Sequence, residues 1–73
     1  MLRDGVQLRE VHRTRPVPDP LLAQARAHGA PFAASLLGNE LVFAQPQPRI
    51  APGQVVAFYD GDLCCGGGIV APD

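Results

Sequence analysis

A chain of 73 residues forms one small domain at most, because a chain this short buries only roughly 60% of the surface that its unfolded form exposes. Eight glycines and eight prolines together make up about twice the average share of these two residues. The hydrophobic fraction of 47% is nevertheless that of a folded domain. Short apolar segments broken by turns are typical of an all-β domain, and they exclude a long helical bundle.

The charges are nearly balanced, with six basic and seven acidic residues and a net charge of −1. The chain therefore lacks the overall basic field that would indicate binding of nucleic acid by the domain alone. All six basic residues are arginines, and four of them fall within the first fifteen positions, at Arg3, Arg9, Arg13 and Arg15. Arginine binds phosphate or carboxylate bidentately, so this cluster hints at such a contact. A high-GC coding bias and a solvated strand are the simpler explanation of the cluster.

Targeting signals and structural cysteine sites are not expected. No segment approaches the roughly 18 apolar residues of a membrane span, and the first five residues lack the apolar core of a secretory signal. The neighbouring Cys64 and Cys65 would bridge only as a strained vicinal disulfide. His12 and His28 have no zinc-ligand spacing to them. We therefore expect a cytoplasmic protein with reduced thiols and no metal.

The first half of the chain predicts a strand, a loop and one ambiguous element. Residues 6–14 alternate loosely between apolar and polar side chains and predict a half-buried strand. Three prolines within residues 15–20 stop regular structure, because proline removes backbone donors and holds the chain extended. Residues 21–28 follow the cap signals of a short helix, with Asp19, Pro20 and Gly29 at its ends. Their alternating alanines instead favour a strand. Local rules lean towards the helix.

The second half predicts strands throughout. Residues 32–37 and 40–45 are two strands around a tight turn at residues 38 and 39. Pro46 and Pro48 are expected to end the second strand, because proline donates no ladder hydrogen bond. A type II turn at residues 51–53 then leads into a strand over 54–59, which a turn at Asp60 and Gly61 joins to a last strand over 63–70. About six short strands indicate a small barrel or sandwich.

The motifs in the last strand favour structural roles. The triple glycine at residues 66–68 lacks the Lys-Ser/Thr of a phosphate loop and precedes no helix, so a bulge or a close backbone crossing explains it better. Asp60 and Asp62 flank Gly61 as in a hairpin turn, and too few oxygen ligands accompany them for a calcium loop. Cys64 and Cys65 have no basic neighbour in sequence and are expected to be small buried hydrophobes. No catalytic set is predicted.

The segment 43–69 resembles the C-terminal end of the tRNA-specific 2-thiouridylases. That family carries a phrase like F-x-x-P-Q-x-x-x-x-P-G-Q-x-x-V-F-Y-D-G-D-x-V-L-G-G-G. The residues that match it in order are Phe43, Pro46, Gln47, Pro52, Gly53, Gln54, Phe58, Tyr59, Asp60, Gly61, Asp62, Gly66, Gly67 and Gly68. Cys64 and Cys65 stand where the family usually has Val and Leu, and Ala27 replaces an aromatic residue. The resemblance is strongest over this segment and weak over the first thirty residues.

The resemblance implies an all-β fold, a six-stranded antiparallel barrel similar to the second domain of elongation factor Tu. It also favours a strand over residues 21–28, against the capping signals. The family's ATP-pyrophosphatase domain, with its catalytic cysteines and nucleotide loop, has no counterpart in residues 1–73. We therefore expect a single barrel domain without catalytic residues and without a cofactor, since ATP is used by the absent domain.

The resemblance further implies partners. The parent reaction is the ATP-dependent 2-thiolation of the wobble uridine of tRNA, and sulfur-donor proteins act on the absent catalytic domain. The barrel is expected to contact tRNA and the remaining domains of the enzyme, and no membrane. The tRNA-contact candidates are Arg9, Arg13, Arg15 and Arg26. The alternative is a free-standing binding module without a tRNA role, and a thiol enzyme at Cys64 and Cys65 is a third hypothesis.

Overall fold

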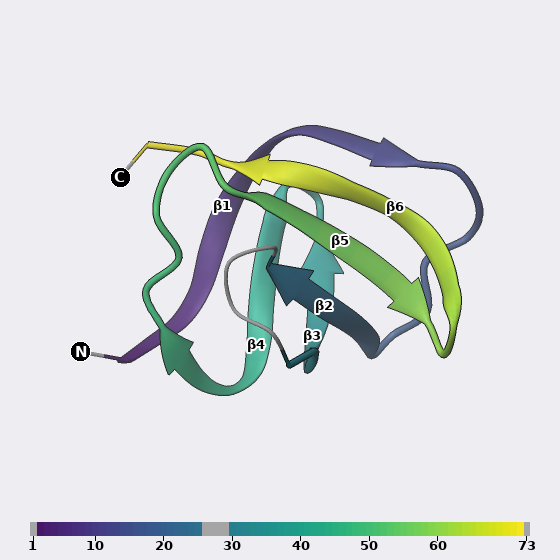
Figure 1. Cartoon of the computed structure of the whole chain (residues 1–73), viewed down its shortest axis with the longest axis horizontal. Coiled ribbons are helices and arrows are strands. Elements are labelled where there is room, and N and C mark those ends of the chain that lie inside the picture. The colour runs from purple at the N-terminus through teal and green to yellow at the C-terminus, as the bar shows by residue number, and fades with distance from the viewer. Residues whose placement is uncertain (1, 26–29, 73) are drawn as a thin grey trace.

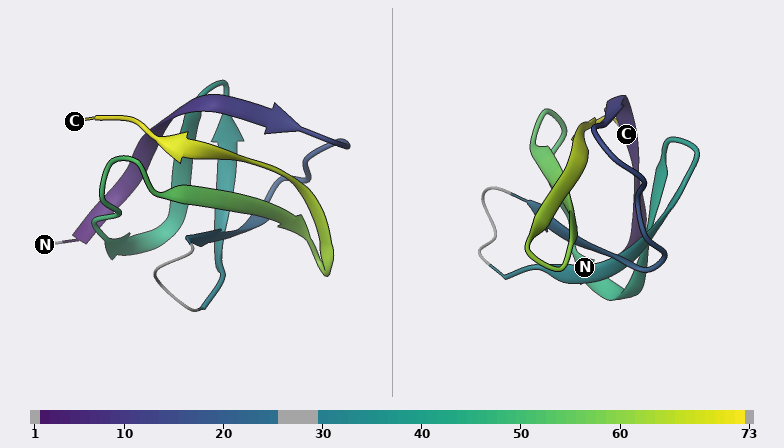
Figure 2. Two further views of the ribbon diagram at one scale, coloured as in Figure 1. Left: turned by 45° about the horizontal axis from the view of Figure 1, so that its top comes forward. Right: turned by 90° about the vertical axis from the view of Figure 1, so that its right-hand side faces the viewer.

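Six antiparallel strands close into a barrel in the computed structural model, which describes residues 2–25 and 30–72 (Figure 1). The strands are β1 (Leu2–Arg13), β2 (Leu21–Ala25), β3 (Phe32–Leu37), β4 (Glu40–Pro48), β5 (Val55–Asp60) and β6 (Leu63–Val70). Around the ring they follow the order β1-β4-β3-β2-β5-β6, and Figure 2 shows this ring from two further sides. The predicted all-β, six-stranded antiparallel barrel is confirmed. Its likeness to the second domain of elongation factor Tu stays a prediction.

Among the described residues no helix is long and apolar enough to cross a membrane. The ambiguous segment is a strand over Leu21–Ala25, which confirms there the strand that the resemblance favoured, whereas the helix that its capping signals favoured is wrong. β2 pairs with β3 on one side and with β5 on the other, so ladders on both edges outweigh the local helix preference of alanine. The last part of the predicted element, residues 26–29, lies outside the described residues.

The core is built from the alternate, inward-facing residues of the strands. Twelve hydrophobic side chains are buried, and among the described residues no polar or charged side chain is. The buried residues are Leu8, Leu21, Ala23, Ala25, Ala34, Leu41, Phe43, Ile50, Val56, Phe58, Cys65 and Val70. Ala23 pairs across the sheet with Phe32 on one side and Phe58 on the other, so one small side chain separates two aromatic ones.

A bulge explains why the apolar pattern of β1 alternates only loosely. Between Arg9 and His12 the strand advances three residues while its partner β6 advances two, from Ile69 to Gly67. Glu10 lies within this step and has a φ of 53°. The extra residue shifts the alternation by one position, so that Val11 packs against the core like Val6 and Leu8 before it.

The predicted end of β4 is wrong, because the strand continues through Pro46 to Pro48. Leu2 and Arg3 of β1 pair with Pro48 and Gln47 on one side of this stretch. On the other side, by contrast, β4 pairs with β3 only over Glu40 to Phe43. Proline is tolerated on a strand edge without a ladder partner. The loss of a donor therefore costs no hydrogen bond on that side.

The loops hold the ends of the strands in place. The residues between β1 and β2 are irregular, as predicted, and the Ser35 hydroxyl of β3 donates a 2.6 Å hydrogen bond to Asp19 Oδ1 in this loop. The type II turn is confirmed, with Gln54 N–H donating to the Ala51 carbonyl at 3.2 Å and a φ of 88° at Gly53. Two further backbone hydrogen bonds, of 2.8 and 2.9 Å, join Gly53 and Gln54 to Val70. The Pro-Gly-Gln motif thus fastens the start of β5 to the end of β6.

The triple glycine lies where three backbones approach one another, which confirms the interpretation as a close crossing. Gly66 has a φ of 140°, and a Cβ there would overlap the carbonyl oxygen of His12 in β1. A Cβ on Gly67 would lie 2.6 Å from the carbonyl oxygen of Val56 in β5. β6 can therefore fit between β1 and β5 only without side chains at these positions.

We expect Gly66→Ala to lower the free energy of unfolding by more than about 3 kcal/mol, because it adds both a steric overlap and backbone strain. Gly61→Ala is the matched control: its φ of 61° is strained, but no atom lies within 4 Å of the added Cβ. That variant should lose only about 1–2 kcal/mol. Urea denaturation of the two variants measures the difference, and equal losses would contradict the close crossing.

Candidate nucleic-acid interface

Three of the four predicted tRNA-contact arginines are exposed on one stretch of chain, namely Arg9 and Arg13 in β1 and Arg15 in the loop after it. Arg9 Nη1 lies 3.7 Å from Glu10 Oε2, an exposed ion pair of little energetic weight. Arg13 Nη2 donates to the carbonyl oxygen of Gly38 at 3.4 Å, which brings it to the β3–β4 hairpin. Arg26 lies outside the described residues.

This arrangement suits an extended polyanion better than a single ion. A strand rises roughly 3.3 Å per residue, so these side chains are spread along the chain instead of converging on one point. Contacts of this kind to successive phosphates give affinity without reading the sequence of the nucleic acid. The geometry is therefore compatible with contact to the backbone of a nucleic acid.

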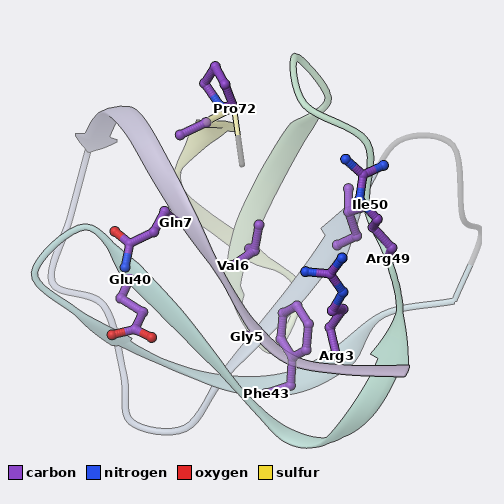
Figure 3. Close-up of a pocket in the computed structure, with 10 residues that line it drawn as sticks. Arg3, Gly5, Val6, Gln7, Glu40, Phe43, Arg49, Ile50 and Pro72 are labelled. Atoms are coloured by element: carbon purple, nitrogen blue, oxygen red, sulfur yellow. The ribbon is translucent and has the colours of Figure 1, made fainter. Parts of the chain in front are cut away.

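A second pair of arginines comes together at the start of β1, where sequence reasoning named no contact. Arg3 and Arg49 line a groove of about 260 Å³ (Figure 3). Phe43 and Ile50, both buried, form its apolar part. Gln7 and Glu40 line its other end; they face each other in the β1–β4 ladder. The groove thus combines an apolar wall with side chains of both charges.

No sequence signal joined Arg3 to Arg49. The two positions meet because β4 pairs with the beginning of β1 as far as Pro48, whereas a strand that ended at Pro46 would not reach this pairing. The Arg-rich start of the chain was visible in the sequence, but the register that brings residue 49 to it was not.

Most of the other motif residues lie in turns or on the outside of the barrel, whereas Phe58 is buried in the core. Pro52 and Gly53 are exposed in the type II turn, and Asp60, Gly61 and Asp62 are exposed at the β5–β6 hairpin. Tyr59 is half-buried and lines a hollow of about 250 Å³ together with Leu22, Gln24 and Asp62. Within residues 2–25 and 30–72, no group of three His, Cys, Asp or Glu side chains is arranged to hold a metal ion.

The two cysteines differ in exposure, which corrects the expectation that both are buried. Cys65 is fully buried, whereas Cys64 is exposed, and both are free thiols. Neighbouring residues of a strand point to opposite faces, so only one of the pair can enter the core. The Cys64 thiol donates to the carbonyl oxygen of Gly66, with 3.7 Å between sulfur and oxygen.

A family model described as the aminomethyltransferase beta-barrel domain matches residues 5–70, almost the entire chain. The chain belongs to this barrel family. A tRNA-specific 2-thiouridylase, MnmA of Roseiflexus sp., is 41% identical over an alignment of 61 residues, which covers 77% of this chain and 16% of the relative. The enzyme of the same name from Halalkalibacterium halodurans is 61% identical over 31 residues, which are 42% of this chain and 8% of the relative.

These matches confirm the resemblance to the C-terminal barrel of the tRNA-specific 2-thiouridylase family. The chain spans less than a fifth of the length of the two curated relatives. Much of the motif that carries the resemblance lies in the type II turn, the β5–β6 hairpin and the glycine crossing, where the backbone geometry is most constrained. Many residues of the family motif thus lie where the strands of the barrel are joined and closed.

The exposure of the two thiols predicts a difference in reactivity. In the native chain we expect an alkylating reagent to modify Cys64 at least ten times faster than Cys65, because the Cys65 side chain is inaccessible. In denaturant both should react at similar rates. Peptide mass spectrometry after timed alkylation measures the two rates, and equal modification in the native chain would contradict the inward placement of Cys65.

Proposed function

We propose that the chain is the C-terminal barrel module of a tRNA-specific 2-thiouridylase, which helps to position tRNA and packs against the rest of the enzyme without catalysing the reaction itself. The observation that carries the proposal is the family match over residues 5–70, together with the 41% identity to the Roseiflexus enzyme. The closed barrel, with a core of hydrophobic side chains, supports a role as a rigid module.

In this proposal the chemistry belongs to other domains. The reaction that the family implies activates C2 of the wobble uridine with ATP and then delivers persulfide sulfur from a cysteine. The barrel itself uses no cofactor, and ATP and the sulfur-donor proteins act on the catalytic domain. A cytoplasmic location agrees with free thiols and with a tRNA substrate.

The contribution of the barrel to tRNA binding is electrostatic in this proposal. Arg9, Arg13 and Arg15 are exposed along β1 and the loop that follows, and Arg26 completes the set. Because the net charge of the chain is −1, contact depends on these local side chains and not on an overall field. The barrel would then hold the tRNA backbone while another domain works on the base.

A chimaera tests the function directly. In the Roseiflexus 2-thiouridylase, the matched 61-residue segment is replaced by this chain, and 2-thiouridine formation in tRNA is measured. We expect the chimaera to keep at least about a tenth of the parent activity, a loss of no more than about 1.4 kcal/mol in transition-state stabilisation. The enzyme without any barrel should lose far more. A chimaera no more active than the truncated enzyme would favour a binding module without a tRNA role.

Two double variants of the chimaera test the tRNA contacts. Arg9→Ala with Arg13→Ala should weaken tRNA binding roughly tenfold at low salt and reduce the slope of log K against log salt by about 0.7–0.9 for each phosphate that is no longer neutralised. Arg3→Ala with Arg49→Ala removes the same charge from the groove at the other end of β1 and is the matched control. Filter binding at several salt concentrations gives both slopes. Equal effects of the two pairs would refute a contact specific to the first.

A further inference from the structure

Three adjacent strands of the barrel, β2, β5 and β6, share an outer surface whose paired residues are all uncharged. Leu22 of β2 pairs with Tyr59 of β5, and Tyr59 pairs with Cys64 of β6. The next outward row consists of Gln24, Ala57 and Gly67, and the third begins with Val55 and Ile69. We call this surface the uncharged face; its residues are Leu22, Gln24, Val55, Ala57, Tyr59, Cys64, Gly67 and Ile69.

The shape and exposure of the uncharged face suit a protein contact. Leu22 and Val55 are exposed to 37% and 46%, whereas Ala57 and Gly67 at the centre are small and leave room for a partner to approach. The hollow of about 250 Å³ beside Tyr59 adds a recess at one end of the face, where Asp62 forms its charged border. In Figure 1 the ribbons of β2, β5 and β6 lie side by side, and β1 follows beyond β6.

The uncharged character of this face decides between kinds of partner. A nucleic acid is bound mainly through Lys and Arg contacts to phosphate, and the eight residues of the uncharged face include neither. The cores of protein interfaces are instead depleted of charged residues and enriched in aromatic ones such as tyrosine. When uncharged side chains are buried in an interface, no charge has to be removed from water, so this desolvation cost does not arise. The face is therefore suited to an apolar protein surface.

We infer that the uncharged face docks on an apolar surface of the domains that accompany this barrel in the complete enzyme. The inference rests on the proposed function and names the surface through which the module packs. The relative from Roseiflexus is about six times longer than the matched segment, which is 16% of it, so a large neighbour is tethered nearby at a high effective concentration. Arg9 of β1 pairs with Ile69 at the border of this face, so the tRNA contacts would begin where the docked surface ends.

Cys64 is a natural probe for this contact, because its exposed thiol lies within the face. In the isolated chain we expect rapid alkylation of Cys64. In the chimaera with the Roseiflexus enzyme, docking should slow alkylation at least tenfold, as followed by mass spectrometry of the peptide that contains Cys64. A cysteine introduced by Ala44→Cys, at an exposed position of β4 outside the face, should react equally fast in both proteins.

A pair of charge insertions gives a matched control. Ala57→Arg places a cation at the centre of the face and should restore fast alkylation of Cys64 in the chimaera. Ala44→Arg adds the same charge on β4 and should leave Cys64 protected. Circular dichroism of the two isolated variants checks that the barrel still forms.

The outcomes separate this inference from the proposed function. Unprotected Cys64 in a chimaera that thiolates tRNA would overturn the docking surface and leave the function standing. Protected Cys64 in a chimaera that does not thiolate tRNA would support the docking surface and contradict the function. Protection that rises with the concentration of the isolated chain would overturn the inferred occupant, because a second copy would then cover the face.

Discussion

The closure of the barrel depends on the passage of β6 between β1 and β5. At Gly66 and Gly67 the neighbouring carbonyl oxygens, of His12 and Val56, occupy the places where side chains would be. If β6 could not enter this gap, the ring would open into a sheet with two free edges, which invite pairing with other chains. The same strand supplies Cys65 and Val70 to the core. The closure of the barrel and its core therefore depend on the same strand.

The number and most bounds of the strands could be predicted because their signals are local. Alternating side chains and turn residues lie next to each other in sequence, and they identified five of the strands. Pairing is not local, and local rules fail where pairing decides the structure. Two flanking ladders turned Leu21–Ala25 into a strand despite its helix caps. The end of β4 is paired on a single side, with β1, and this allowed the strand to continue through Pro46 and Pro48.

The candidate site was predictable only in part for the same reason. The arginines of β1 could be named because they cluster in sequence, and the family could be recognised because its motif is continuous. The meeting of Arg3 with Arg49 depends on strand register, which composition does not encode. The exposure of Cys64 was missed because hydrophobic character was weighed above the alternation of a strand, which sends only one of two neighbouring residues inward.

The pairing of Ala23 between Phe32 and Phe58 has a consequence for the evolution of this barrel. Interiors are close-packed, so a change in the size of one of these side chains has to be accommodated by its neighbours. A larger residue at position 23 would have to be accompanied by a smaller one at position 32 or 58. Among relatives these positions should therefore covary in size while their sum stays nearly constant, and a drifting sequence could cross such a change only through a less stable intermediate.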